Sequence, residues 1–364
     1  MRRIELSELL KEVAEGRPVQ EVDVSGLDLS GQDLRGAIFT GVLAKGTLFR
    51  GARLESLLFQ ESNLMHADFS GAALGRSAFL ECDLDGALFS GAEAEGARFV
   101  GTKATGTRFE KSRLVRSSWI KGTLEAVSFV GCDLERASFV EGSFGTVDFS
   151  GARLVKTSFL GVDLSRGRFQ GTSFHNPIFV KTVLRGLDFS GMRLPMIQAS
   201  GCDLSGTRWE RASASLGNFF QADLSGAVFD RAEAETVLFS EAILRGLSAR
   251  GARFPMASFQ KADCTGANFS DADLGLSPFT HADLTGADFT GARLVFCDFS
   301  HADLAGAIFR GADLTRSNLH RAKEGSATFD PEMRALARET DPERTQAEDF
   351  VPQIFDDQEG SHVP

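Results

Sequence analysis

The chain contains no tyrosine, only two tryptophans and only nine prolines, although it has 364 residues and 32 phenylalanines. Because a phenyl ring carries no polar atom, this bias predicts aromatic side chains packed in a dry interior. The five cysteines do not have the spacing of a metal site, so we expect small buried side chains in a reduced compartment. P-loop, dinucleotide-binding and hydrolase motifs are missing as well, so we expect no enzyme, no cofactor and no metal.

Long apolar runs are also missing. No stretch reaches the roughly 18 apolar residues that a membrane-spanning helix requires, and the first residues, Met1 to Leu6, lack the apolar core of a secretory signal. With 24% charged and 42% hydrophobic residues, the composition is typical of a soluble globular protein. We therefore expect a cytoplasmic protein that does not contact a membrane.

The sequence does contain a repeat. A central residue, mostly Phe or Leu, recurs at every fifth position from Val24 to Leu319 without insertion or deletion. The residue two positions before each centre is almost always small, as in Ala67-Asp68-Phe69, and glycine often stands two positions after the centre. A period of five fits neither a helix nor a flat strand, so the chain must turn every five residues. Such self-similarity predicts a solenoid.

This pattern resembles the pentapeptide-repeat family, whose members follow an A-(D/N)-L-x-x motif, and the resemblance covers residues 22–321. It implies an all-β solenoid, a right-handed quadrilateral β-helix with four pentads per coil, about 15 coils and short helical caps at both ends. Residues twenty apart would then stack. Phenylalanines such as Phe49 and Phe69 would form one ladder, and Phe39 and Phe59 would form another that faces it, with leucines between them.

The chain divides into four predicted segments. Residues 1–21 are an N-terminal helical cap with a helix over 4–15, and residues 22–321 are the β-helix. Residues 322–340 are a C-terminal capping helix that starts at Asp330 and Pro331, and 341–364 are an acidic disordered tail. Residues 322–364 hold four basic and eleven acidic side chains, so most of the net charge of -11 lies outside the rod.

Two columns of apolar residues at outward corner positions predict a surface that binds another protein or a second copy of this chain. The first column contains Leu80, Val100, Ile120, Val140, Leu160, Val180 and, two coils later, Phe220. The second column, at the other corner of the same side, contains Met196, Leu216, Met256, Leu276 and Phe296, with Thr236 between them. The competing interpretation is that β-branched residues suit strands whatever they face.

Three further features have plain structural interpretations. Arg76, Arg116, Arg136 and Lys156 form a short basic run, which we interpret as solvated surface. His281 and His301 stack one coil apart near Asp283 and Asp303, and we interpret them as exposed corner residues rather than metal ligands. In the core, small centres combine with large residues at positions that are normally small. This combination predicts local repacking, and a bend of the rod is an alternative. The small centres are Ala199, Ala214, Ala234 and Ala249, and the large residues are Met192, Ile197 and Leu247.

The expected function is that of a noncatalytic scaffold or adaptor that presents one side of a rigid rod to a protein partner. The family resemblance also suggests a bacterial setting, such as an adaptor of type VI secretion. The alternative is a DNA mimic that binds DNA gyrase and protects it from inhibitors, as some members of this family do. A DNA mimic needs a dense anionic surface. Here the rod is nearly balanced in charge, and its main acidic column contains Asp203, Asp223, Asp263, Asp283 and Asp303. We expect no direct binding of nucleic acid.

Overall fold

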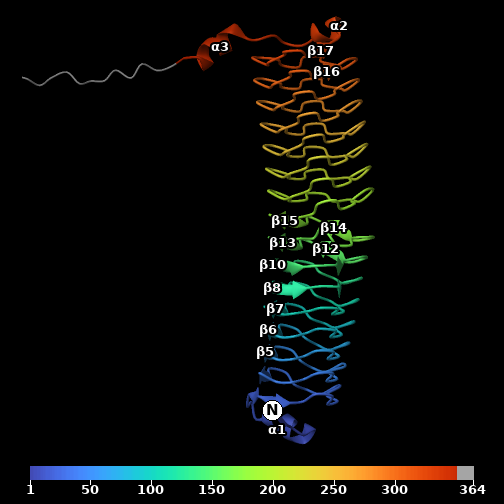
Figure 1. The fold of residues 1–364 in the computed structure, drawn as a ribbon, viewed down its shortest axis with the longest axis vertical. Helices are drawn as coiled ribbons and strands as arrows, with labels where there is room; N and C mark the ends of the chain where they lie inside the picture. The colour runs from blue at the N-terminus through green and yellow to red at the C-terminus, as the bar shows by residue number, and fades with distance from the viewer. Residues whose placement is uncertain (351–364) are drawn as a thin grey trace, which may run out of the picture.

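The computed structural model describes residues 1–350 and shows a straight rod of stacked coils (Figure 1). Strands and bridges pair residues that are twenty positions apart, from Val19 with Phe39 to Asn318 with Arg338. Four pentads therefore complete one turn, as the resemblance implied. The stack has about 16 turns, and at about 4.8 Å per turn the rod is roughly 75 Å long.

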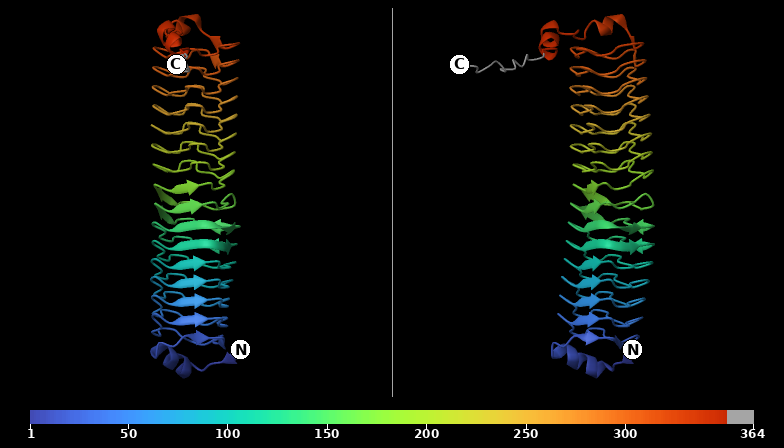
Figure 2. Two further views of the ribbon diagram at one scale, coloured as in Figure 1. Left: turned by 90° about the vertical axis from the view of Figure 1, so that its left-hand side faces the viewer. Right: turned by 60° about the vertical axis from the view of Figure 1, so that its left-hand side comes forward.

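One side of the rod carries a nine-stranded parallel sheet, in the order β15-β13-β10-β8-β7-β6-β5-β4-β2 (Figure 2). Beyond Val180 the coils continue through isolated bridges with the same spacing of twenty. The strands of this sheet are β2 (Val19–Gln20), β4 (Ile38–Thr40), β5 (Leu58–Gln60), β6 (Ala78–Leu80), β7 (Arg98–Val100), β8 (Ser118–Leu124), β10 (Ser138–Phe144), β13 (Ser158–Leu160) and β15 (Ile178–Val180). The remaining strands form two-stranded pairs: β1 (Arg2–Arg3) with β3 (Val22–Asp23), β9 (Val127–Ser128) with β11 (Val147–Asp148), β12 (Arg153–Val155) with β14 (Ser173–His175), and β16 (Ile308–Phe309) with β17 (Thr328–Phe329).

Two phenylalanine ladders fill the core, as predicted. Within a ladder the rings stack, as Phe69 does on Phe89 at 4.7 Å and 11°. Between ladders they meet edge to face, as Phe69 does with Phe79 at 5.7 Å and 87°. Aromatic pairs in these two geometries add about 0.5–1.5 kcal/mol each beyond the area that they bury. The absence of tyrosine follows from this arrangement, because a phenol hydroxyl would find no partner between stacked rings.

Small polar residues at the inward positions bind the backbone of the coil before them. Thr107 Oγ1 donates to the carbonyl of Leu84, and Cys132 Sγ lies 2.8 Å from the carbonyl oxygen of Phe109. All five cysteines are free and buried, and burial raises the pKa of Cys132 to about 12. These thiols therefore pack as small core residues.

The alanine-centred zone is repacked in the predicted way. Ile197 and Leu247 are buried at positions that are normally small, whereas Met192 is only partly buried. Phe254 is buried in the same zone and lies 5.9 Å from Phe229, edge to face. The coils stay in register through this zone, and no bend is visible (Figures 1 and 2).

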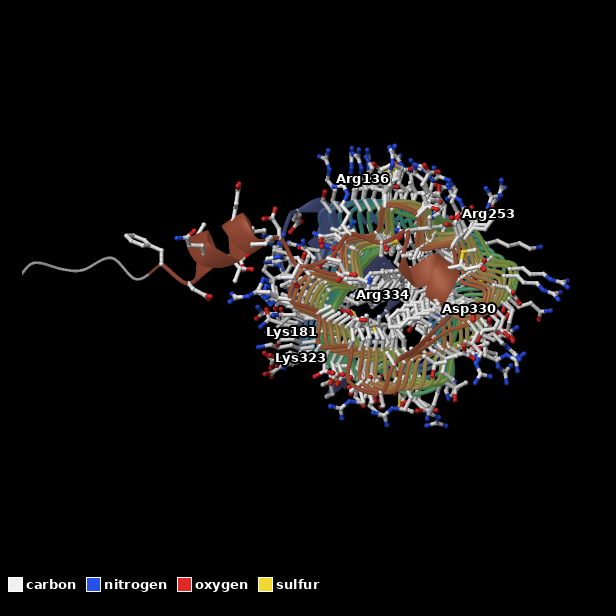
Figure 3. All side chains as sticks on the ribbon, turned by 90° about the horizontal axis from the view of Figure 1, so that it is seen from above. Arg136, Lys181, Arg253, Lys323, Asp330 and Arg334 are labelled. Carbon is white, nitrogen blue, oxygen red and sulfur yellow. The ribbon has the colours of Figure 1, made fainter. Side chains whose placement is uncertain are left out.

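The two ends differ from the predicted segments. Helix α1 (Leu6–Ala14) covers the first coil, but Val19 already belongs to the coil stack. At the other end Phe329 still stacks on Phe309 at 4.6 Å, so the coils run beyond residue 321. The capping helix is only the four-residue α2 (Pro331–Arg334), which lies over the last coil (Figure 3).

Residues that we expected to be disordered form helix α3 (Pro342–Glu348), beside the rod rather than over its end (Figure 1). The Asp341 side chain caps it by accepting from the backbone amides of Glu343 and Arg344, a contact typical of helix starts. Residues 351–364 of the predicted tail lie outside the described residues. Among residues 1–350, no helix has both the length and the apolar composition needed to cross a bilayer.

Candidate functional site

All twelve predicted partner-binding residues lie on the side of the rod that carries the nine-stranded sheet, which we call the sheet face. Each coil presents three outward residues there, for example Arg76, Ala78 and Leu80. We call the position of Arg76 the leading corner and that of Leu80 the trailing corner. The trailing corner contains Leu80, Val100, Ile120, Val140, Leu160, Val180 and Phe220, and the leading corner contains Met196, Leu216, Met256, Leu276 and Phe296.

The two corners differ in exposure, which the sequence pattern does not show. At the trailing corner the side chains stack in register, as Val140 does between Ile120 and Leu160, and most are half-buried. At the leading corner Leu216 and Leu276 are each 56% exposed. The more accessible apolar surface is therefore the later, leading-corner group.

The sheet face also carries exposed apolar residues that the sequence analysis missed. Ile38 and Leu238 are 40% and 44% exposed at the middle position of their pentads. Many pentads carry a polar residue at this position, as in Ala67-Asp68-Phe69, so apolar residues there were a usable signal. By contrast, Val130 and Ile243 are 37% and 39% exposed on other sides of the rod, and no similar group surrounds them.

The leading corner adopts a backbone conformation that disfavours its side chains. Met256 has φ 58° and Leu276 has φ 65°, in the left-handed region where a non-glycine residue costs about 1–2 kcal/mol. Each is the third residue of a hydrogen-bonded turn, and Ala257 N donates to Phe254 O at 3.2 Å in the turn of Met256. The corner diagonally across the coil has glycine every twenty residues from Gly186 to Gly306. The leading corner therefore retains bulky side chains where glycine would be the relaxed choice.

Charge is distributed unevenly over the sheet face. Its outward positions from Gly36 to Thr280 include no acidic residue, although the chain has a net charge of -11. The cations there are Arg76, Arg98, Arg116, Arg136 and Lys156. From residue 176 to residue 280 these positions carry no charge at all. The sheet face is therefore cationic in its first half and neutral and apolar in its second.

The predicted acidic column lies on the next side of the rod and is partly neutralised. Asp203 pairs with Arg185, and Asp263 pairs with Arg245 at 2.5 Å. Although partial burial acts in the opposite direction, hydrogen bonds from Ser205 and Arg185 lower the pKa of Asp203. These carboxylates are ionised but share their charge with arginines of the same chain.

A histidine cluster forms where α3 meets the rod. His281 stacks on His301 at 4.7 Å, as predicted, but His320 and Glu348 complete the group in place of the two aspartates that we considered. His281 is exposed as expected, whereas His301 is half-buried beside Glu348. His301 Nε2 and His320 Nε2 lie 3.2 and 3.1 Å from the same oxygen, Glu348 Oε2. The sequence analysis missed this contact, because it placed Glu348 in a disordered tail.

The hydrogen bonds of this cluster describe a docking contact rather than a metal site. His320 Nδ1 accepts from the backbone N–H of Asp341 at 3.1 Å, so in the neutral ring Nε2 carries the proton and donates it to Glu348. A metal at Nε2 would displace that proton. Arg344 Nε also donates to Glu348, at 2.8 Å. The hydrogen bond from His320, together with those from Arg344 and His301, lowers the pKa of Glu348 to about 2.

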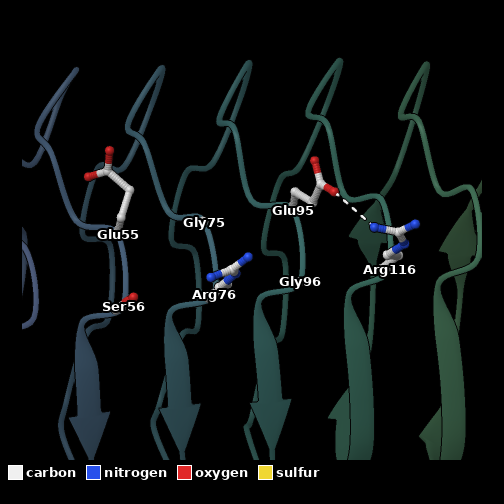
Figure 4. Close-up of a pocket in the computed structure, with 7 residues that line it drawn as sticks. All are labelled: Glu55, Ser56, Gly75, Arg76, Glu95, Gly96 and Arg116. Carbon is white, nitrogen blue, oxygen red and sulfur yellow. Dashed lines mark ion pairs between the residues drawn. The ribbon is translucent and has the colours of Figure 1, made fainter.

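Depressions in the described surface are shallow. One lies at the leading corner, between Arg76 and Arg116, where Gly75 and Gly96 provide no side chain (Figure 4). Glu95 lines the same depression and is bonded to Arg113 and, more distantly, to Arg116 at 3.6 Å. This surface suits side chains of a partner better than a small molecule, which needs a deeper enclosure.

Comparisons with known proteins agree with the repeat. A model of the pentapeptide repeat region matches residues 72–148. A model of pentapeptide repeats (8 copies) matches residues 144–179, 218–254, 257–294 and 292–323. A comparison with curated protein sequences gives no match.

Among solved structures, HetL, a pentapeptide repeat protein involved in heterocyst differentiation regulation from the cyanobacterium Nostoc sp. strain PCC 7120, is 21% identical. The match covers 86% of this chain and 96% of HetL, with a TM-score of 0.26. QnrB1, a plasmid-mediated fluoroquinolone resistance protein, is 18% identical over 56% of this chain and 85% of its own, also with a TM-score of 0.26. A pentapeptide repeat protein from the Arabidopsis thaliana thylakoid lumen is 25% identical over 42% and 74%, with a TM-score of 0.17. None of these similarities bears on what this chain binds.

Proposed function

The chain belongs to the pentapeptide repeat family, and from this premise we propose that it is a noncatalytic scaffold or adaptor that binds another protein along its sheet face. The observation that carries the proposal is the leading corner. Exposed apolar residues there hold a strained backbone conformation, over a stretch of the face that carries no charge. Charged residues at the next corner have the same conformation, as Glu241 does with φ 58°, so the proposal depends on the exposure and apolar character of the leading corner.

The shape of the rod supports a binding role. Depressions on the described surface are open, and those at the corners are lined mainly by charged residues and glycine. A rigid side about 75 Å long can hold an extended partner, or more than one, at a fixed spacing. A role in bacterial secretion of the type VI kind stays part of this proposal, as does self-association of two copies.

The alternative function, a DNA mimic that binds gyrase, requires a dense anionic surface. The acidic column could contribute to one, but Arg185, Arg245 and Lys323 form ion pairs with three of its five aspartates. The sheet face is instead cationic in its first half and uncharged in its second. We therefore favour the scaffold, and a gyrase supercoiling assay separates the two functions. Protection of gyrase from a quinolone would favour the mimic.

Glutamate substitutions test the scaffold. Leu216→Glu and Leu276→Glu should remove the protein that coprecipitates with the wild type from its source cells. The matched controls are Val130→Glu and Ile243→Glu, which alter exposed apolar residues on other sides of the rod. These controls should retain the partner. Circular dichroism checks the fold of all four variants, and sedimentation velocity shows whether the partner is a second copy. Equal binding by all four variants would contradict the proposal.

A further inference from the structure

In the middle of the sheet face's first half, small residues lie between two rows of longer side chains, and we call this arrangement the trough. Its floor consists of Ser118, Ser138 and Ser158, which pair in register on strands β8, β10 and β13. The leading corner forms a cationic wall with Arg116, Arg136 and Lys156, and the trailing corner forms an apolar wall with Ile120, Val140 and Leu160. Small floor residues between two rows of longer side chains leave room for a partner element.

The cations of this wall are poorly neutralised by the chain itself. Within residues 1–350, Arg76 and Lys156 form no ion pair. Arg136 approaches only Glu135, at 4.0 Å, and Arg116 approaches Glu95 at 3.6 Å. Figure 3 shows Arg136 pointing away from the rod. Arg153, on the neighbouring side, instead bonds Asp133 at 2.9 Å and Glu135 at 2.7 Å. Cations whose ion pairs within the chain are long or missing favour carboxylates of a partner.

The backbone of the sheet face limits how a partner can bind. Each strand between β2 and β15 pairs with the coils on both of its sides, so no free strand edge is available there for an added β-strand. A partner must bind through side chains. From Leu80 to Val180 the apolar trailing corner spans five coil steps, or about 24 Å, and the serine floor lies in the middle of this length. An α-helix of about 16 residues has that length, and its pitch of about 5.4 Å is close to the coil spacing.

We propose that this trough binds an acidic amphipathic α-helix of a protein partner, laid along the rod axis. Its apolar stripe would pack on Ile120, Val140 and Leu160, and its carboxylates would face Arg116, Arg136 and Lys156. Nucleic acid fits less well, because the apolar wall offers nothing to a phosphate backbone. This inference rests on the proposed function and specifies its partner.

The test uses the full chain and a displayed library of 16-residue helical peptides, with an apolar stripe fixed and the flanking positions randomised. Selection should enrich aspartate and glutamate on one flank. Arg116→Glu combined with Arg136→Glu should weaken the selected peptides about tenfold. Replacing the selected acids by lysine should restore binding to that double variant. The control, Arg193→Glu combined with Arg253→Glu, removes exposed cations of another side and should bind like the wild type.

Two results would overturn the trough proposal: selected peptides without acidic enrichment, or undiminished binding by the trough double variant. Binding of a labelled DNA duplex that the same variant abolishes would overturn it in favour of nucleic acid. The same variants distinguish a failure of the trough proposal from a failure of the proposed scaffold function. A cellular partner lost by Leu276→Glu but not by Arg116→Glu with Arg136→Glu leaves the scaffold standing and removes the trough. A partner that neither set of variants affects removes both.

Discussion

The substitution Met256→Gly should leave the free energy of unfolding within about 1 kcal/mol of wild type, although it deletes a long side chain from the rod. Met256 follows Pro255 in the turn closed by Ala257 N and Phe254 O, with φ 58° at Met256. Proline followed by glycine is the favoured pair for a turn with this positive φ. The natural residue is thus the less suitable one for the turn.

Three contributions determine the expected change in the free energy of unfolding of Met256→Gly. Glycine relieves the left-handed penalty of Met256, about 1–2 kcal/mol. It loses more backbone entropy on folding, about 0.5–1 kcal/mol. Because Met256 is 42% exposed, its deletion forfeits only part of the burial energy of a methionine, about 1 kcal/mol. These contributions nearly cancel.

Urea unfolding followed by circular dichroism measures the result, with two controls. Gly246→Met places the same side chain at another corner, where φ is 62° and an added Cβ meets no atom within 4 Å. It should destabilise by about 1 kcal/mol. Leu274→Ala, in the core at 0% exposure, should destabilise by about 2–5 kcal/mol. A loss above about 2 kcal/mol for Met256→Gly would refute the reasoning, because Met256 would then be needed for packing and not for a surface.

Two further predictions concern the chain end and the thiols. Glu348→Gln should release α3 from the rod. Amide hydrogen exchange in residues 342–348 should then become faster, with unchanged exchange in the coils. Glu343→Gln, on the same helix, is the control and should leave the exchange unchanged. The pKa of Glu348 is lowered to about 2 from 4.5. The free energy that this carboxylate contributes to the docking of α3 is therefore present above pH 4.5 and is lost as the pH falls toward 2. Protection of α3 from hydrogen exchange that does not change over that range would contradict the contact. Burial raises the pKa of Cys82 to about 12 and of Cys202 to about 11, so iodoacetamide at pH 8 should label neither thiol until urea unfolds the rod, and rapid labelling in the native state would contradict their burial.

Much of the fold could be predicted from the sequence because a solenoid is one-dimensional. Each coil contacts only its neighbours, so a period of five with alternating small and large inward residues fixes which side chains face the core. Phe69 and Phe79 could be placed in facing ladders by their spacing alone, once four pentads per coil were assumed. The same logic placed the apolar corner residues outside.

The ends were less predictable because they do not repeat. Helix α3 lies in a segment poor in apolar residues, and its position depends on Glu348 meeting His301 and His320, which belong to successive coils. Composition alone predicts disorder for such a segment. A few charge-assisted hydrogen bonds to a preformed surface hold it instead.

The sequence by itself determined the coil, its aromatic core and the side of the rod that carries apolar residues, since side-chain size at a fixed period decides what lies inside. Only the tertiary structure decided how those residues are presented. Stacking in register half-buries Val140 against its neighbours, whereas the left-handed corner holds Leu276 out at 56% exposure. The tertiary structure also decided which arginines form ion pairs, because an ion pair requires a carboxylate that the same coil or a neighbouring coil brings within reach.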